Sequence, residues 1–205
     1  MKAIFTILAT ATLAASFALA QSPATPPASA TPPAPRNPIG SRRENQQDRI
    51  ANGVQSGQLT AGETKNLESG EANLNREIHS DRSADGGKLT AGERQQVNRQ
   101  QNNLSHSIYN DKHNAAQQHF SGQVGARQEN QQDRIAQGIR SGQMTAGEAA
   151  RAENRQQGIN QQIHADRAAN GGKLSGQQRA RINQRQNGAS RQIYNQKHNA
   201  QHQAH

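Results

Sequence analysis

Histidines near the end of the chain are the residues whose spacing comes closest to a metal site. His198 and His202 stand four residues apart, so both imidazoles would lie on one face of a continuous helix. Two imidazoles at that separation suit a divalent ion such as Zn²⁺, Ni²⁺ or Cu²⁺. No Cys, Asp or Glu stands nearby to complete the set. The pair is therefore a candidate transition-metal site, and the alternative is that these histidines are solvated or stack on tyrosines such as Tyr194.

Catalytic chemistry has no comparable support in the sequence. His79 precedes Asp81 by two residues, and His164 precedes Asp166 in the same way. Residues two apart on a helix point about 200° away from each other, so these pairs are not acid–base pairs. Nothing resembles a nucleophile elbow, a phosphate-binding loop or a closed zinc site. We therefore expect no enzyme activity and predict no catalytic or cofactor-binding residues.

One eight-residue stretch occurs four times, and its residues are those that begin helices. SGQLTAGE (56–63) returns as GGKLTAGE (86–93), SGQMTAGE (141–148) and GGKLSGQQ (171–178). In each, a Thr or Ser is followed three residues later by Glu or Gln, which is the spacing of a capping box. The Gly before it allows the chain to leave the preceding helix through a positive φ. The pattern predicts helices over 41–55, 61–84, 91–118, 126–140, 146–169 and 176–202.

The whole helical region is duplicated. ENQQDRIANG (44–53) matches ENQQDRIAQG (129–138), and IYNDKHNA (108–115) matches IYNQKHNA (193–200), each 85 residues later. Apolar residues spaced seven and then four apart give the longer helices one apolar face. We expect an all-α fold of two tandem three-helix units, packed as a small bundle or as paired hairpins. The predicted units are 41–119 and 126–205, with a short linker at 120–125.

The turns also resemble the second half of an EF-hand calcium loop. As in that family, Gly57 is followed two residues later by an apolar residue and six residues later by Glu63. The resemblance implies paired helix–loop–helix units. In DRSADGGKLTAGE (81–93) it also implies a Ca²⁺ ligand set, provided that one extra residue after Gly86 is accommodated. That set is Asp81, Ser83, Asp85 and Glu93. The alternative is a capped turn without metal, so Ca²⁺ is a candidate cofactor.

A second resemblance is to the Spy-type periplasmic chaperones, which are small, basic, cysteine-free helical proteins with duplicated LTxxQ motifs. LSGQQ (174–178) and the LTAGE turns are similar to those motifs. The resemblance implies that an unfolded protein client binds to a basic surface.

The N-terminal residues predict export. MKAIFTILATATLAASFALAQ has one Lys, an apolar run and an A-x-A cleavage site, which indicates a signal peptide over 1–20. Its removal would leave no stable membrane span. Residues 21–40 are rich in Pro and Ala and are expected to form an extended linker. We therefore expect a periplasmic or secreted protein that has a binding or structural role in the bacterial envelope.

Positive charge is concentrated in the second unit. Residues 42–118 carry ten Lys and Arg against ten Asp and Glu, whereas residues 126–203 carry twelve against five. An anionic envelope polymer, or an unfolded protein, is therefore expected to bind the C-terminal unit. The chain has only two Tyr, three Phe and no Trp, so few rings can stack on bases. Specific nucleic-acid binding is not expected.

Overall fold

The computed structural model describes residues 38–203, and within that range the chain is all-α and contains no strand. The fold class predicted from the sequence is thus confirmed. The helices are α1 (Pro38–Gln55), α2 (Ala61–Ala84), α3 (Ala91–Lys112), α4 (Gly122–Arg140), α5 (Ala146–Ala169) and α6 (Gly176–Lys197).

The helical region begins slightly earlier than expected. The predicted signal peptide and residues 21–37 of the predicted linker lie outside the described residues. Residues 38–40, which were also expected in the linker, are instead the first turn of α1. A proline such as Pro38 is tolerated there because the first N–H groups of a helix have no intrahelical partner.

The four repeated stretches are helix starts, as their spacing predicts. A complete capping box stands before α2, α3, α5 and α6. In the first of them, Thr60 N–H donates to Glu63 Oε2 at 2.8 Å, and Glu63 N–H donates to Thr60 Oγ1 at 3.3 Å. The preceding glycines Gly57 and Gly142 have φ values of 72° and 67°, a region in which other residues are strained. Each of the four repeated stretches therefore ends one helix and begins the next.

The ends of α3 and α6 differ from the prediction. These helices stop at Lys112 and Lys197, whereas helix was expected up to 118 and 202. In the second unit the chain after Lys197 folds back onto the turn between α4 and α5. Gln203 N–H donates to the Gly142 carbonyl at 2.9 Å, and the Gln203 side chain accepts from Ala146 N–H at 3.0 Å. The first unit makes the same contacts through Gln118, so each tail caps the first turn of the long middle helix.

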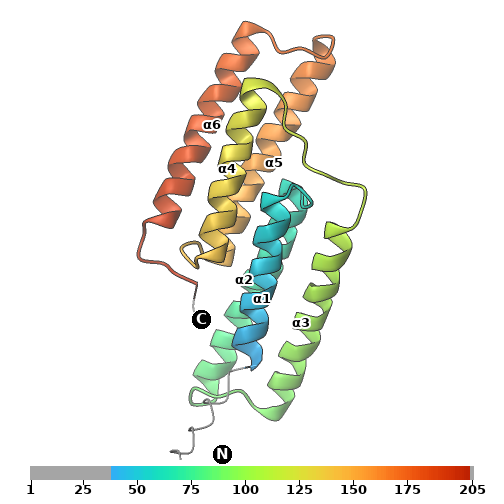
Figure 1. Ribbon diagram of the computed structural model, residues 1–205. Helices are drawn as coiled ribbons and strands as arrows, with labels where there is room; N and C mark the ends of the chain where they lie inside the picture. The colour runs from blue at the N-terminus through green and yellow to red at the C-terminus, as the bar shows by residue number, and fades with distance from the viewer. Residues whose placement is uncertain (1–37, 204–205) are drawn as a thin grey trace, which may run out of the picture. The chain divides into compact units, whose positions relative to one another are not determined.

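The two units pack together through their first and second helices. In Figure 1, α1 and α4 lie side by side, α2 and α5 lie behind them, and α3 and α6 lie on opposite outer sides. The most extensive contacts join α2 to α5 and α1 to α4, so they cross between the two copies. The described residues 38–203 therefore form one compact body rather than two separate bundles.

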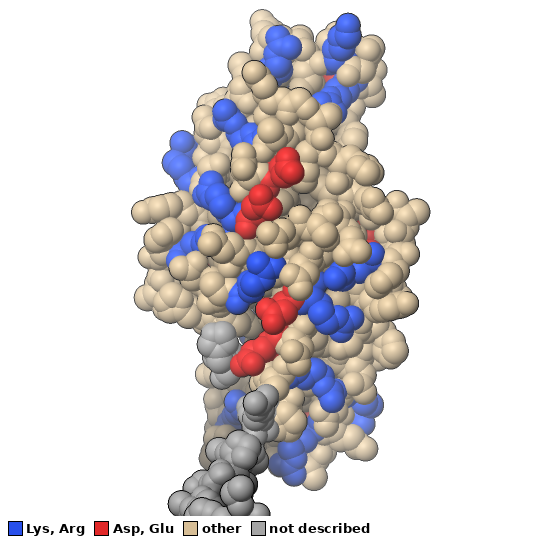
Figure 2. Space-filling view, in the orientation of Figure 1, with Lys and Arg blue, Asp and Glu red and all other residues tan. Residues whose placement is uncertain are grey.

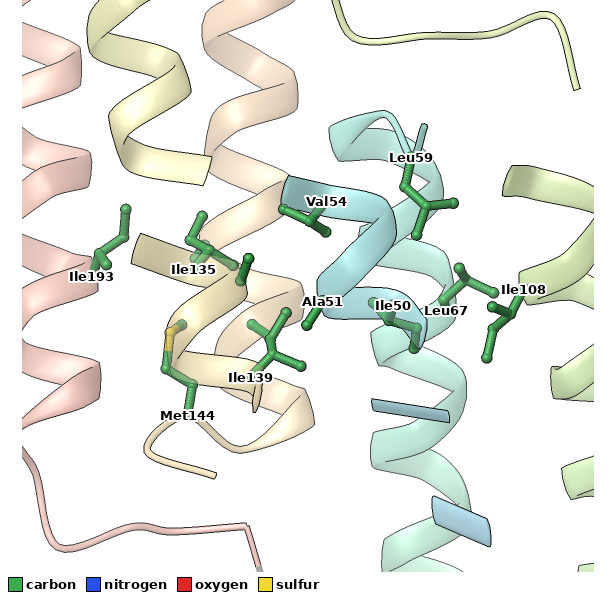
Figure 3. Close-up of a cluster of buried hydrophobic side chains, with 13 residues drawn as sticks. Ile50, Ala51, Val54, Leu59, Leu67, Ile108, Ile135, Ile139, Met144 and Ile193 are labelled. Atoms are coloured by element: carbon green, nitrogen blue, oxygen red, sulfur yellow. The ribbon is translucent and has the colours of Figure 1, made fainter. Parts of the chain in front are cut away.

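The central core is built from both copies (Figure 3). Ala51 on α1 lies beside Ile139 of α4, Val54 lies about one turn further along α1, and Ile50 points toward Leu67 of α2. All of them belong to one buried apolar cluster, which also receives residues from α3, α5 and α6. Two smaller clusters lie away from this centre, one in each copy. The copies are thus held together by apolar burial, which contributes about 2 kcal/mol for each large aliphatic side chain.

Buried glutamines join the outer helices to the centre in the same way in both copies. Gln46 Nε2 donates to the Gln101 carbonyl at 2.7 Å and to Ser105 Oγ at 2.8 Å. Its counterpart Gln131 donates to the Gln186 carbonyl and to Ser190 Oγ, both at 2.7 Å. Because buried amides are costly unless they are hydrogen-bonded, these repeated pairs fix the positions of α3 and α6.

Candidate functional site

The four residues of the predicted calcium set lie around the turn between α2 and α3. Asp85 is the C-cap residue of α2, and a hydrogen bond to Glu93 together with the charge of that residue raises the pKa of the Asp85 carboxyl. Partial desolvation and then the nearby Glu93 and Glu77 raise the pKa of Asp81. Glu93 therefore lies near enough to both Asp81 and Asp85 to influence their ionisation.

The remaining contacts of this set belong to the helices. Glu93 Oε2 accepts from Thr90 N–H at 2.7 Å, and this bond is the main cause that lowers the pKa of Glu93. Ser83 Oγ donates to the His79 carbonyl of its own helix at 2.8 Å. Within residues 38–203, no three Asp, Glu, His or Cys side chains are grouped so that they could hold a metal ion. The calcium site stays a prediction, because binding would require Glu93 to exchange its capping role for a ligand role.

The predicted histidine pair is not on one helix. α6 ends at Lys197, His198 is its C-cap residue, and His202 lies in the segment that follows. The His198 ring stacks on Tyr194, with ring centroids 4.1 Å apart, and its Nδ1 lies 2.7 Å from the Tyr194 carbonyl oxygen. The first unit contains the same stack between Tyr109 and His113. The stacked alternative is confirmed for His198, and the metal pair stays a prediction without the helical spacing that suggested it.

An open basic groove lies on the described surface. It has a volume of about 1050 Å³ and is lined by α2, α5 and α6. None of its lining residues, all within 38–203, is Asp or Glu. The face formed by α1 and α4 is different, because acidic side chains lie along its middle between basic ones (Figure 2). The cations of the groove are Lys65, Arg76, Arg151, Arg155, Arg181 and Arg185.

Two arginines of the groove cross between α5 and α6 over glycines. A Cβ placed on Gly188 of α6 would lie 3.3 Å from Nη1 of Arg155 on α5. A Cβ placed on Gly158 of α5 would lie 3.3 Å from Nη2 of Arg185 on α6. Each guanidinium group therefore lies against the backbone of the opposite helix, where a side chain would displace it.

The first unit provides an internal comparison for this groove. The corresponding hollow between α2 and α3 is about 510 Å³, contains Asp111 and has no Lys or Arg among its lining residues, all of them in the described range. At the positions of Arg155 and Arg185 the first unit has Gly70 and Gln100, 85 residues earlier. The arginines at 155 and 185 are thus specific to the second copy and are not required by the repeated fold.

Three buried carboxyl groups lie where α2 packs against α5. Glu68, Glu71 and Glu153 are buried, and Gln156 takes the place of Glu71 in the second copy. Burial raises the pKa of Glu153 to about 8 and that of Glu71 to about 7, the rise at Glu71 being moderated by Arg43 and Gln47. Burial and the nearby Glu71 raise the pKa of Glu68 well above its usual range. These groups hold protons under conditions in which surface carboxyls are charged.

Comparison with known proteins adds no assignment. No protein-family model matches this chain, and neither a curated protein nor a solved structure matches it. None of the helices within 38–203 has the length and apolarity that crossing a bilayer requires. The functional interpretation therefore depends on the residues of the groove.

The sequence contained part of the signal for this groove. Arg151 and Arg155 are four apart on one helix, and Arg181 and Arg185 are four apart on the next, so each pair occupies one helical face. The surplus charge of the second unit also indicated this half. The contribution of Lys65 and Arg76 could not be found in the same way, because α2 belongs to the other copy and reaches the groove only through the packing of α2 on α5.

Proposed function

We propose that this protein is an exported, non-enzymatic helical-repeat protein of the bacterial envelope that binds an anionic partner in the basic groove. One observation carries the proposal, namely six cationic side chains around a groove that no carboxylate lines. Without a ligand these charges repel one another, so an anion that neutralises them gains attraction and relieves that repulsion. The groove is open to solvent rather than enclosed, which suits a polymer better than a small molecule that must be surrounded.

The chemistry of the groove also supports binding rather than catalysis. Its lining contains Arg, Lys, Asn, Gln and Ser side chains with Ala and Gly, and no His, Asp, Glu or Cys that could move a proton or attack a substrate. Arginine stays positively charged over the whole physiological pH range and binds planar or tetrahedral oxyanions through two N–H groups at once. The expected activity is therefore reversible, salt-sensitive binding.

A charge-matched pair of double variants tests the proposal. Arg155→Ala with Arg185→Ala removes two groove charges, whereas Arg127→Ala with Arg191→Ala removes two charges from α4 and α6 outside the groove. Binding of dextran sulfate is measured by isothermal titration calorimetry at two salt concentrations. We expect the groove variant to lose at least about tenfold in affinity, and the control to lose little, because exposed charges contribute about 1 kcal/mol each only where they contact the ligand.

Equal losses in the two variants would contradict the groove as the site, since only net charge would then matter. The Spy-like alternative predicts a different result, in which the protein suppresses aggregation of a denatured client and dextran sulfate does not compete. The described surface has only two exposed large apolar side chains, Tyr109 and Tyr194, with which to hold such a client.

A further inference from the structure

A second basic hollow adjoins the groove. It has a volume of about 940 Å³ and shares Ala72, Arg76, Gly147 and Arg151 with the groove. Its own cations are Arg43 and Arg82, and His79 and His202 also line it. Of its lining residues, which all belong to the described part of the chain, none is Asp or Glu. The two hollows therefore adjoin each other and are alike in charge.

We infer that the two hollows form one trench that binds a single linear polyanion made of closely spaced oxyanion groups and lacking bases. The inference rests on the proposed function and specifies its ligand class. It places Arg76 and Arg151, which border both hollows, at the middle of the bound chain.

The length of the trench argues for an extended ligand. Lys65 lines the first hollow and Arg82 the second, and both lie on α2. Seventeen residues of helix separate them, which corresponds to about 25 Å along the axis. A single phosphate or sulfate group contacts only one or two arginines over such a distance. A chain with many charges contacts the cations of both hollows, and each contact adds to the affinity.

The side chains of the trench argue for oxyanions without bases. Seven of its eight Lys and Arg residues are arginines. Guanidinium groups bind phosphate, sulfate or carboxylate oxygens in pairs. No Phe, Tyr or Trp lines either hollow within residues 38–203, so the trench offers no aromatic surface for base stacking. Small residues among its lining leave room for the ligand backbone to approach the helices, namely Ser69, Ala72, Gly147 and Ala150.

Arg82 is a better residue than Arg43 for testing whether the two hollows act as one trench, because Arg43 already has partners within the protein. The Arg43 guanidinium donates to Asn75 Oδ1 at 3.1 Å and lies near the buried Glu71. Arg82 lies at the far end of the second hollow with respect to Lys65 along α2 and does not line the first hollow. A variant of Arg82 therefore tests whether the ligand occupies both hollows or only the first.

The test compares a short and a long anion on three single variants. Arg185→Ala affects only the first hollow, Arg82→Ala only the second, and Arg191→Ala neither. Affinities of the purified chain for tripolyphosphate and for long-chain polyphosphate are measured by calorimetry over a range of salt concentrations. Circular dichroism checks that each variant keeps its helices.

We expect both Arg185→Ala and Arg82→Ala to weaken long-chain polyphosphate about fivefold, and each to lower the slope of log K against log salt by about one. Arg82→Ala should leave tripolyphosphate binding unchanged, and Arg191→Ala should leave both ligands unchanged. Dextran sulfate, polyglutamate and oligothymidylate then show whether phosphate, sulfate or carboxylate is preferred and whether bases add affinity.

The outcomes separate the two proposals. If Arg185→Ala weakens the long chain but Arg82→Ala does not, the single trench is wrong and the groove proposal stands. If neither variant differs from Arg191→Ala, both are wrong. If Arg82→Ala weakens the binding of tripolyphosphate as much as that of long-chain polyphosphate, the second hollow is an independent site and the single trench is wrong. Tighter binding of oligothymidylate than of polyphosphate overturns the base-free ligand class.

Discussion

The buried carboxyls between α2 and α5 predict that the protein becomes less stable as pH rises. Burial raises the pKa of Glu71 to about 7 and that of Glu153 to about 8, from an ordinary value of 4.5. Above pH 4.5 the unfolded chain therefore releases protons that the folded chain still holds. A raised pKa stabilises the fold fully below the unfolded value, and this stabilisation is lost as pH rises through the folded value. The affected window runs from about pH 5 to about pH 8.

The magnitude follows from the size of the pKa change. Each unit corresponds to about 1.4 kcal/mol, so the rise at Glu71 amounts to about 3 kcal/mol and the rise at Glu153 to about 5 kcal/mol over the full window. Near pH 6 Glu71 and Glu153 are protonated only in the folded chain, and together they should lower the free energy of unfolding by about 3 kcal/mol for each pH unit. Glu68, whose pKa is also raised, adds to the fall in the same direction.

The variant Glu71→Gln removes the titration of Glu71 and so measures its contribution to the pH dependence. The second copy shows that Gln fits, because Gln156 at the equivalent place is buried and donates to Gln131 Oε1 at 3.1 Å. The variant should match the parent near pH 5 and exceed it by up to about 3 kcal/mol near pH 8, with a slope that is smaller by about 1.4 kcal/mol per pH unit. The inverse control, Gln156→Glu, adds a buried carboxyl and should steepen the slope.

Urea unfolding followed by far-UV circular dichroism at several pH values gives the required free energies. A stability that is flat or increasing between pH 5 and pH 8 would refute the reasoning, as would a Glu71→Gln variant that keeps the slope of the parent. A changed m value would show that the variant alters the surface exposed on unfolding. The slopes of the free energy of unfolding against pH would then be compared only between data sets that have the same m value.

Three further predictions concern the turns. Thr60→Ala removes the N-cap acceptor of α2 and should cost about 1 kcal/mol in urea unfolding; an unchanged midpoint would mean that the cap does not matter. Gln203→Ala removes the side-chain oxygen that accepts from Ala146 N–H, while the backbone bond to Gly142 remains. The variant should lower Tm, and more rapid amide exchange at Ala146 should locate the effect. For the EF-hand-like turn, the prediction is that Ca²⁺ raises Tm and that Asp85→Ala abolishes the increase; a Tm that does not respond to Ca²⁺ would contradict the calcium site.

Local interactions made most of the fold predictable. Each capping box joins residues three apart, and each preceding Gly acts on its own turn, so the starts of α2, α3, α5 and α6 could be assigned without tertiary information. The ends of α3 and α6 could not. They depend on Gln118 and Gln203, which bond to turns more than fifty residues away, and the sequence around them continues a helical pattern.

The buried acids were missed for a related reason. Glu68 and Glu153 are charged residues on helices and would ordinarily be assigned to the solvent face. They are buried because α2 of one copy covers α5 of the other, and the amides of Gln47 and Gln132 donate to them at 3.3 and 2.9 Å. Only the packing of the two copies against each other, which local spacing does not determine, reveals this layer.

The duplication separates what maintains the fold from what we propose for binding. The buried amide contacts of Gln46 recur in Gln131 with the same partners, because both copies must hold their outer helix in the same place. On the exposed face between the second and third helix of each copy, that constraint is absent. There the second copy has Arg155 and Arg185, with glycines opposite them, where the first has Gly70 and Gln100. Adjacent like charges on a surface are unfavourable unless a counter-charge binds them. Their concentration in one groove is therefore better explained by an anionic ligand than by any requirement of the helical scaffold.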